Sequence, residues 1–125
     1  MKKIISTVNA PKAIGPYSQA VEVNSMLFIS GQVPIDPACM KVVEGGIKEQ
    51  TFQVMNNIGA ILDEAGYSFA DVVKCTCFLA DMQYFGDMNE IYGSFYKEGP
   101  PARAAFAVRS LPLGVLVEIE AIAVK

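Results

Sequence analysis

The side chains best suited to chemistry on a substrate lie near the end of the chain. Arg103 is one of only two arginines, and it follows Pro100-Pro101-Ala102 at the start of a predicted strand. A guanidinium there presents a planar fork that suits a carboxylate or a phosphate, although a surface salt bridge is the alternative. For Arg109, beside Ser110 at the far end of that strand, a surface role is preferred.

Glu118 and Glu120 share one face of the last predicted strand, with Cα atoms about 7 Å apart. One interpretation is a charged stripe facing solvent. However, Leu116, Ile122 and Val124 surround the two glutamates, so at least one carboxylate is expected to be partly buried. Burial raises the pKa of a carboxyl, which can then act as a general base. A glycosidase-like pair is a weaker alternative, because the chain has no tryptophan to stack on a sugar.

The absence of histidine narrows the chemistry further. It excludes Ser-His-Asp and Cys-His catalysis, HExxH zinc sites and imidazole acid–base switching. Gly45-Gly46 fits no phosphate-binding pattern. An enzyme of this sequence must work with carboxylates, guanidinium, hydroxyls, thiols or backbone amides.

The three cysteines indicate neither a disulfide framework nor a metal site. Cys75 and Cys77 lie two residues apart on a predicted strand, too far apart for a relaxed disulfide. Without a histidine or a second cysteine pair, zinc is poorly supported, and two core thiols are the better interpretation. Cys39 lies in a predicted loop with no activating base nearby.

Length and composition predict one domain over residues 1–125, because 52% of the residues are hydrophobic and only 18% are charged. That excess of apolar residues favours an oligomer. The net charge of -3 and the lack of a basic stripe disfavour nucleic acid as a partner. No apolar run is long enough for a membrane span, and the start lacks the apolar stretch of a signal peptide. A cytoplasmic location is therefore expected, with no membrane partner.

Residue patterning predicts an α+β fold, a mixed sheet with two helices packed on one face. Residues 1–18 are expected to be irregular, and a loop is expected over Gly31 and Pro34–Pro37. In the last strand Val117, Ile119, Ala121 and Ala123 form one side, and neither side is fully polar, so another subunit is expected to cover one of them. The predicted strands are Gln19–Val23 and Met26–Ser30 around Asn24-Ser25, a short edge element over Lys41–Glu44, and strands over Asp71–Asp81, Arg103–Arg109 and Val115–Val124. The first predicted helix runs over Lys48–Ala65, includes Phe52 on its buried face and stops at Gly66. The second runs over Tyr84–Lys97, and its inner face is expected to be core, with Phe85, Met88, Ile91, Tyr92 and Phe95.

Five segments together resemble the RidA/YjgF family of reactive-intermediate deaminases, and the resemblance covers essentially the whole chain. In order, they are Gly15-Pro16-Tyr17-Ser18-Gln19-Ala20, Ile29-Ser30-Gly31-Gln32-Val33-Pro34, Met88-Asn89-Glu90-Ile91-Tyr92, Pro101-Ala102-Arg103, and Leu111–Gly114 followed by Val117–Ala123.

The resemblance implies a chorismate-mutase-like fold and a homotrimer with active sites in the clefts between subunits. It implies hydrolysis of 2-imino acids, such as 2-iminobutanoate and 2-iminopropanoate, to 2-keto acids and ammonia, with no cofactor or metal. Carried over by position, the catalytic residues are Arg103, which grips the carboxylate, and Glu118, which activates water; Glu120 is the less favoured base. The implied substrate-binding residues are Tyr17, Ser30, Gly31, Asn89 and Ala105.

Two positions depart from the family pattern. Ala105 stands where some members carry a cysteine, so a thiol role there is lost, and Ala38–Lys41 replaces a Thr-Gly turn. The family also contains regulators, translation inhibitors and ribonucleases, so a binding module or a ribonuclease on the same fold remains the alternative function. Against RNA stand the acidic charge and the missing imidazole pair.

Overall fold

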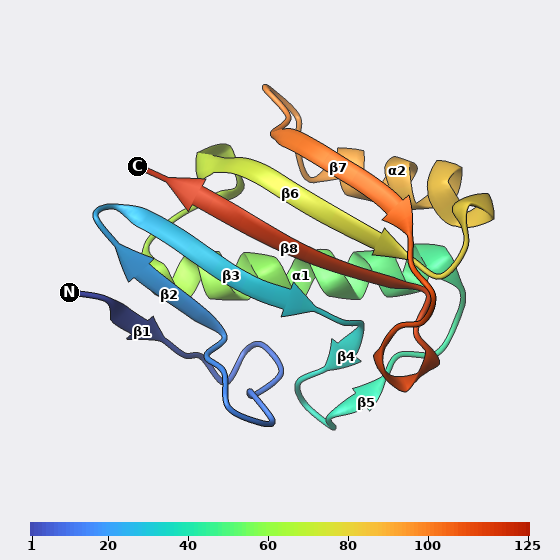
Figure 1. Cartoon of the computed structure of the whole chain (residues 1–125), viewed down its shortest axis with the longest axis horizontal. Coiled ribbons are helices and arrows are strands. Elements are labelled where there is room, and N and C mark those ends of the chain that lie inside the picture. Colours follow the sequence, from blue (N-terminus) through green and yellow to red (C-terminus); the bar gives the residue numbers. More distant parts are fainter.

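The computed structural model describes all 125 residues as a mixed six-stranded sheet with two helices on one face (Figure 1). The α+β prediction is therefore confirmed. The sheet order is β1-β2-β3-β8-β6-β7, and only the β6–β7 pair is parallel. The strands of this sheet are β1 (Lys3–Ile5), β2 (Ala20–Val23), β3 (Met26–Gln32), β6 (Val72–Leu79), β7 (Ala102–Ala107) and β8 (Val117–Val124).

The remaining elements are two α-helices, a small hairpin and three short turns of 3-10 helix. The helices are α1 (Ile47–Ala65) and α2 (Phe85–Ser94), and the hairpin pairs β4 (Ile35–Asp36) with β5 (Lys41–Val42). The 3-10 turns are η1 (Phe69–Asp71), η2 (Met82–Tyr84) and η3 (Pro112–Gly114).

Helix α1 crosses the back of the sheet and supplies much of the core (Figure 1). Its apolar residues at helical spacing, Val54, Met55, Ile58, Ile61 and Leu62, are all buried. The helix ends at Gly66, whose φ of 80° is the left-handed conformation that glycine accepts readily, as predicted. The predicted burial of Phe52 is wrong. The residue is 54% exposed, because Phe52 lies on the outer flank of the helix and packs on Phe95 instead.

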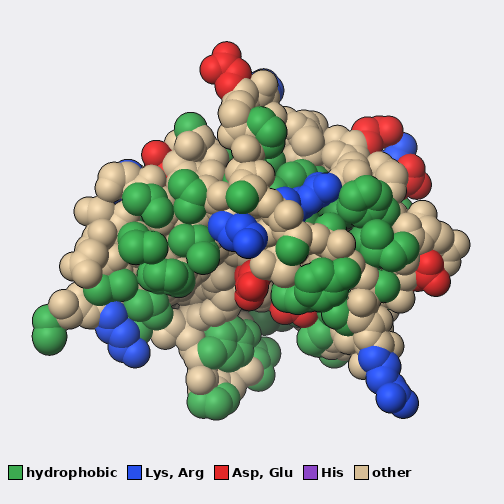
Figure 2. Space-filling view, turned by 45° about the horizontal axis from the view of Figure 1, so that its top comes forward, with side chains coloured by type: hydrophobic (Ala, Val, Ile, Leu, Met, Phe, Trp, Pro, Cys, Tyr) green, Lys and Arg blue, Asp and Glu red, His purple; other side chains and the backbone are tan.

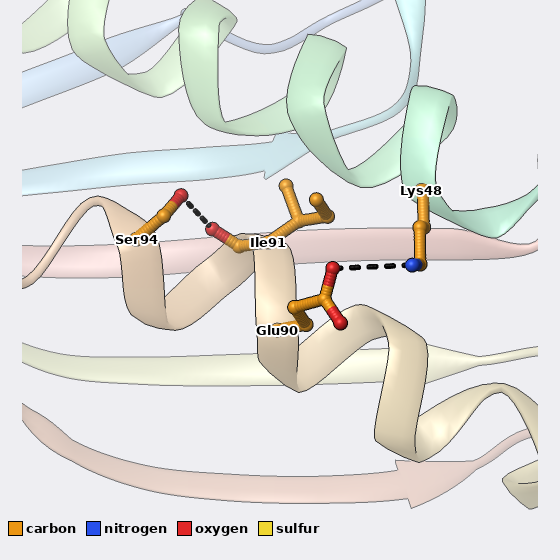
Figure 3. A network of polar contacts seen from close by, with 4 residues as sticks. All are labelled: Lys48, Glu90, Ile91 and Ser94. Carbon is orange, nitrogen blue, oxygen red and sulfur yellow. Dashed lines mark hydrogen bonds and ion pairs between the residues drawn. The ribbon is translucent and has the colours of Figure 1, made fainter.

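Helix α2 lies beside α1 and is shorter than the predicted Tyr84–Lys97, because Tyr84 belongs to η2 and the helix ends at Ser94. The Lys48 ammonium pairs with the Glu90 carboxylate at 3.1 Å across the two helices (Figure 3). The Ser94 hydroxyl donates to the Ile91 carbonyl in the last turn. Met88 and Tyr92 are the buried residues of α2, so this helix presents them to the sheet.

Strand β8 lies between β3 and β6 and has two unlike sides. Val117, Ile119, Ala121 and Ala123 are buried beneath the helices, as the alternation predicted. The other side belongs to what we call the open face, which no helix covers (Figure 1). Figure 2 looks obliquely onto this face from the β7 edge and shows hydrophobic groups with isolated charges between them. Its exposed apolar side chains include Ile4 (53%), Phe28 (39%), Phe106 (45%) and Val124 (38%).

The prediction that residues 1–18 are irregular is wrong at Lys3–Ile5, which form β1 against β2. A three-residue edge strand is too short to leave a readable alternation. The expected loop over Gly31 and Pro34–Pro37 is wrong in two places, since Gly31 continues β3 and β4 starts at Ile35. The β2–β3 hairpin is confirmed, with positive φ at both Asn24 and Ser25.

Cys75 and Cys77 are core thiols, as predicted, and burial raises the pKa of Cys77 to about 12. Cys39 is exposed in the β4–β5 turn. Neither helix has the length and apolar character needed to cross a membrane.

Candidate functional site

The predicted site residues fall into two groups on opposite faces of the sheet. In the β6–β7 pairing, Arg103 lies opposite Cys75, whose side chain is buried beneath the helices. In the β6–β8 pairing, Glu118 lies opposite Phe78, one position out of phase with the buried cysteines. Side chains alternate between the two faces of a sheet, so Arg103 is on the helix side and Glu118 is on the open face.

A cavity of about 740 Å³ on the open face, which we call the Glu118 cavity, holds the first group. Both glutamates line it, so the structure brings Glu118 and Glu120 together with Tyr17, Ser30 and Gly31. Pro11, Lys12, Ile14, Gln19, Gln32, Val33, Ile35, Met40, Pro112 and Leu113 also line it. Its mixed lining, apolar with a few convergent polar groups, is typical of a small-molecule site.

A β-bulge in β3 shapes the floor of the Glu118 cavity. Ile29 pairs with Ala121, but Gln32 already pairs with Ile119, so β3 has one extra residue at Ser30–Gly31. The Ser30 hydroxyl donates to the Ser18 carbonyl at 2.6 Å, which holds the bulge against the preceding segment. A Cβ placed on Gly31 would overlap Oε2 of Glu118, so only glycine leaves room for the carboxylate here.

The Glu118 carboxylate is half-buried, and the hydrogen bonds of the chain do not include it as an acceptor. Burial raises its pKa above the usual glutamate range, and the neighbouring Glu120 charge adds to the rise. The single ion pair of the chain, Lys48 with Glu90, lies elsewhere. Glu118 is thus an unpartnered carboxylate facing a cavity, with a pKa shifted towards that of a useful base.

The loop that carries Tyr17 into this cavity is held by Gln19, a residue to which sequence reasoning gave no role. The Gln19 side chain is buried, accepts from the Thr7 amide at 2.7 Å, and donates to the carbonyls of Thr7, Ala10 and Pro11. Tyr17 itself is exposed, and its hydroxyl accepts from the Ile14 amide at 3.4 Å. A polar residue at the first position of a strand was the only sequence signal for the Gln19 anchor.

The second group lies between the edge strand β7 and helix α2. One terminal nitrogen of Arg103, Nη1, donates to Oδ1 of Asn89 at 2.6 Å. The Arg103 guanidinium carbon also lies 5.4 Å from the centre of the Phe85 ring and 5.0 Å from that of Tyr92. The structure therefore brings Arg103 and Asn89 together, and it adds two aromatic neighbours that sequence reasoning placed only in the core.

Ala105 lies two residues after Arg103 on the same face of β7, opposite Cys77. Its side chain is a methyl group, which has no reactive atom. No three cysteine, aspartate or glutamate side chains of the chain lie together in a way that could hold a metal ion.

The two groups supply different parts of one reaction site. A guanidinium with unpaired donors can bind a carboxylate, and a half-buried glutamate beside a cavity can remove a proton from water. Within one chain the sheet separates them.

Comparison with known proteins relates the chain to a family at nearly full length. Residues 7–125 match the family described as Endoribonuclease L-PSP. A RutC family protein of Pyrococcus horikoshii is 56% identical over 125 residues, which cover 100% of this chain and 99% of that protein. The mouse 2-iminobutanoate/2-iminopropanoate deaminase is 53% identical and covers 100% of this chain and 93% of its own length. The crystal structure of a Rid family protein from Yersinia pestis superposes with a TM-score of 0.98 at 45% identity, over 100% of both chains.

Proposed function

The chain belongs to the Endoribonuclease L-PSP family, which is the RidA/YjgF family, and on that basis we propose that it hydrolyses reactive 2-imino acids to 2-keto acids and ammonia. The observation that carries the proposal is the unpartnered Glu118 carboxylate, held against Gly31 in a cavity large enough for a small imino acid. Relatives about 50% identical are named 2-iminobutanoate/2-iminopropanoate deaminase, which supports this substrate class.

In the proposed reaction, Arg103 binds the substrate carboxylate through guanidinium donors that Asn89 leaves free. Glu118 takes a proton from water as the water oxygen attacks the C=N carbon. Glu118 then returns its proton to the nitrogen of the resulting carbinolamine, and the C–N bond breaks. The hydroxyl proton of the carbinolamine passes to the departing ammonia, so the C=O bond of the 2-keto acid forms and ammonium leaves. A protonated imine plus water becomes a 2-keto acid plus ammonium, so atoms and charge balance.

The chain's own groups suffice for this step. A protonated imine is already electrophilic, so positioning and one base supply what the reaction needs. Tyr17 and Ser30 shape the cavity around the base, and Gly31 sets where the carboxylate lies.

We further propose that two copies of the chain complete each site, in a homotrimer. Because the sheet separates Arg103 from Glu118, an intact site needs Arg103, Asn89 and Ala105 from one copy and Tyr17, Ser30, Gly31 and Glu118 from another. Two features support this arrangement: β7 is an edge strand, so Arg103 lies at the rim of the sheet, and the open face carries exposed apolar side chains.

A coupled assay tests the function. The protein is added to a pyridoxal-phosphate-dependent threonine dehydratase, and release of 2-ketobutyrate is followed. The wild type is expected to accelerate release. The deaminase activity, measured as kcat/KM, is expected to fall at least about 100-fold in Arg103→Ala and in Glu118→Gln. Arg109→Ala is the matched control, since it removes the other, exposed arginine. Full activity in Arg103→Ala or Glu118→Gln would contradict the proposed roles.

A ribonuclease is the alternative that the family description suggests. The net charge of -3 and the absence of histidine argue against RNA as substrate. RNA cleavage that persists in Arg103→Ala after repeated purification, without acceleration of the dehydratase by the wild type, would favour the alternative.

A further inference from the structure

We propose that Phe85 and Tyr92 act with Asn89 as a clamp that fixes the plane of the Arg103 guanidinium and so sets how tightly the substrate carboxylate binds. We call these three residues the α2 clamp. The inference rests on the proposed function, and it assigns Phe85 and Tyr92 as positioning residues, because they act on the substrate only through Arg103.

The α2 clamp is one face of one helix. Its residues are spaced four and three apart, so they follow each other along the side of α2 that looks towards β7. The Arg103 guanidinium carbon is 5.4 Å from the Phe85 ring centre and 5.0 Å from the Tyr92 ring centre, both within cation–π range. A long flexible side chain is thereby held at three points by a rigid element.

The clamp leaves part of the guanidinium free. Arginine has five N–H donors, and the only one with a partner in this chain is on Nη1, which bonds Asn89. A carboxylate binds best to two parallel donors in one plane, so its affinity depends on the orientation of that plane. Rings that lie against the guanidinium restrict its rotation without using any donor, which reserves the free N–H groups for the substrate.

Tyr92 touches Arg103 through its ring alone, because the one hydrogen bond of the Arg103 guanidinium goes to Asn89 and the Tyr92 hydroxyl takes no part in it. The neighbouring buried hydroxyl, Tyr96 Oη, lies 3.4 Å from Cys75 Sγ and so takes that thiol as its partner. The Tyr96 ring packs on the Tyr92 ring with centres 4.9 Å apart, which holds Tyr92 under Arg103. Tyr92→Phe therefore keeps the ring of the α2 clamp, whereas Tyr92→Leu removes it.

The first experiment measures carboxylate binding by titrating the proteins with 2-ketobutyrate, the proposed product, in a calorimeter. Tyr92→Leu is expected to raise the Kd about tenfold and to raise KM more than it lowers kcat in the coupled assay. Tyr92→Phe is expected to match the wild type. Phe95→Leu is the matched control, because Phe95 packs on Phe52 and Phe69 rather than on Arg103. Equal Kd values for Tyr92→Leu and the wild type would overturn the inference.

The second experiment observes the guanidinium without reference to activity. The chain has only two arginines, so the ¹⁵N spectrum of arginine Nε–H groups contains two signals, and Arg109→Lys assigns them. The Arg103 signal is expected to be shifted by the rings and to move towards the Arg109 signal in Tyr92→Leu. If Tyr92→Leu does not fold, Phe85→Leu replaces it, since Phe85 is only half-buried.

The two experiments separate the inference from the proposed function. A wild type that leaves the dehydratase unaffected refutes the deaminase, while the Arg103 signal still reports whether the rings hold the guanidinium. An Arg103 signal that is the same in the wild type, Tyr92→Leu and Phe85→Leu refutes the clamp even in an active deaminase.

Discussion

At the scale of single residues, the Glu118 carboxylate occupies the space that any side chain at position 31 would need. The position where a Gly31 Cβ would lie is taken by the end of the Glu118 side chain. That end is flexible, so a methyl group there would push the carboxylate aside without forcing the backbone to move. Gly31 therefore matters for where the base lies more than for whether the chain folds.

Gly31→Ala is accordingly expected to fold, with a free energy of unfolding within about 1 kcal/mol of the wild type, and to lose at least about 100-fold in activity. Urea denaturation and the coupled assay measure the two quantities. Gly86→Ala is the control, because a methyl group at Gly86 would have nothing within 4 Å of it. Wild-type activity in Gly31→Ala would show that the carboxylate position is not critical.

The second residue-scale prediction concerns pH. Glu118 must be ionised to act as a base, and both burial and the Glu120 charge raise its pKa. Activity should therefore fall as pH drops through that raised pKa, at a higher pH than for an ordinary glutamate. Removing the Glu120 charge lowers the pKa of Glu118, so Glu120→Gln should move the acidic limb of the pH–activity profile to lower pH. A limb that stays in place, or moves to higher pH, would contradict the coupling.

At the scale of elements, the N-terminal segment depends on one side chain. Gln19 makes four hydrogen bonds to the backbone of Thr7, Ala10 and Pro11, and this segment brings Lys12, Ile14 and Tyr17 to the Glu118 cavity. The loop has no helix or strand of its own between β1 and β2. Its position is therefore set by a buried amide.

Gln19→Ala is expected to cost about 2–4 kcal/mol of unfolding free energy, because it leaves buried backbone groups unpaired. Activity should fall with it, since the cavity wall loses its anchor. Urea denaturation measures the cost, with Gln83→Ala as an exposed glutamine control that stays within about 0.5 kcal/mol of the wild type. An equal stability for the two variants would show that the loop holds its place by other means.

Sequence patterns could predict the long helices and strands, because apolar residues recur at regular spacing along them. The apolar residues of α1, followed by Gly66, indicate a helix, and the alternation from Val117 to Ala123 indicates a strand. They could not predict β1 or the bulge at Ser30–Gly31, since a three-residue strand and a single extra residue leave almost no periodic signal. Phe52 shows a further limit, because helical spacing finds an apolar stripe but not the edge at which burial stops.

For the site, the resemblance supplied the residues and a position between subunits, but no residue pattern could show on which face of the sheet each side chain lies. The face on which Arg103 lies depends on the register between β6 and β7, and the residue pattern of one strand does not determine that register. Phe85 and Tyr92 looked like ordinary core residues, because a guanidinium neighbour comes from a strand that is distant in sequence.

At the scale of the whole molecule, the separation of Arg103 and Glu118 makes a prediction about mixtures. Arg103→Ala and Glu118→Gln should each be inactive alone. Mixed by unfolding and refolding together in equal amounts, they should regain about a quarter of wild-type activity, because random assembly pairs an intact Arg103 with an intact Glu118 in about a quarter of sites. Mixing folded proteins without exchange is the control. A mixture that stays inactive after exchange would place both residues in a site within one chain.

The two unlike sides of β8 and its neighbours have one more consequence. On the proposed function, a solitary chain holds a base without a substrate anchor on one side of its sheet and an anchor without a base on the other. A newly synthesised chain would be inactive until it assembled with other copies. Specific activity should therefore decline on dilution, and the cell's stock of working enzyme would depend on the concentration of the chain more steeply than in direct proportion.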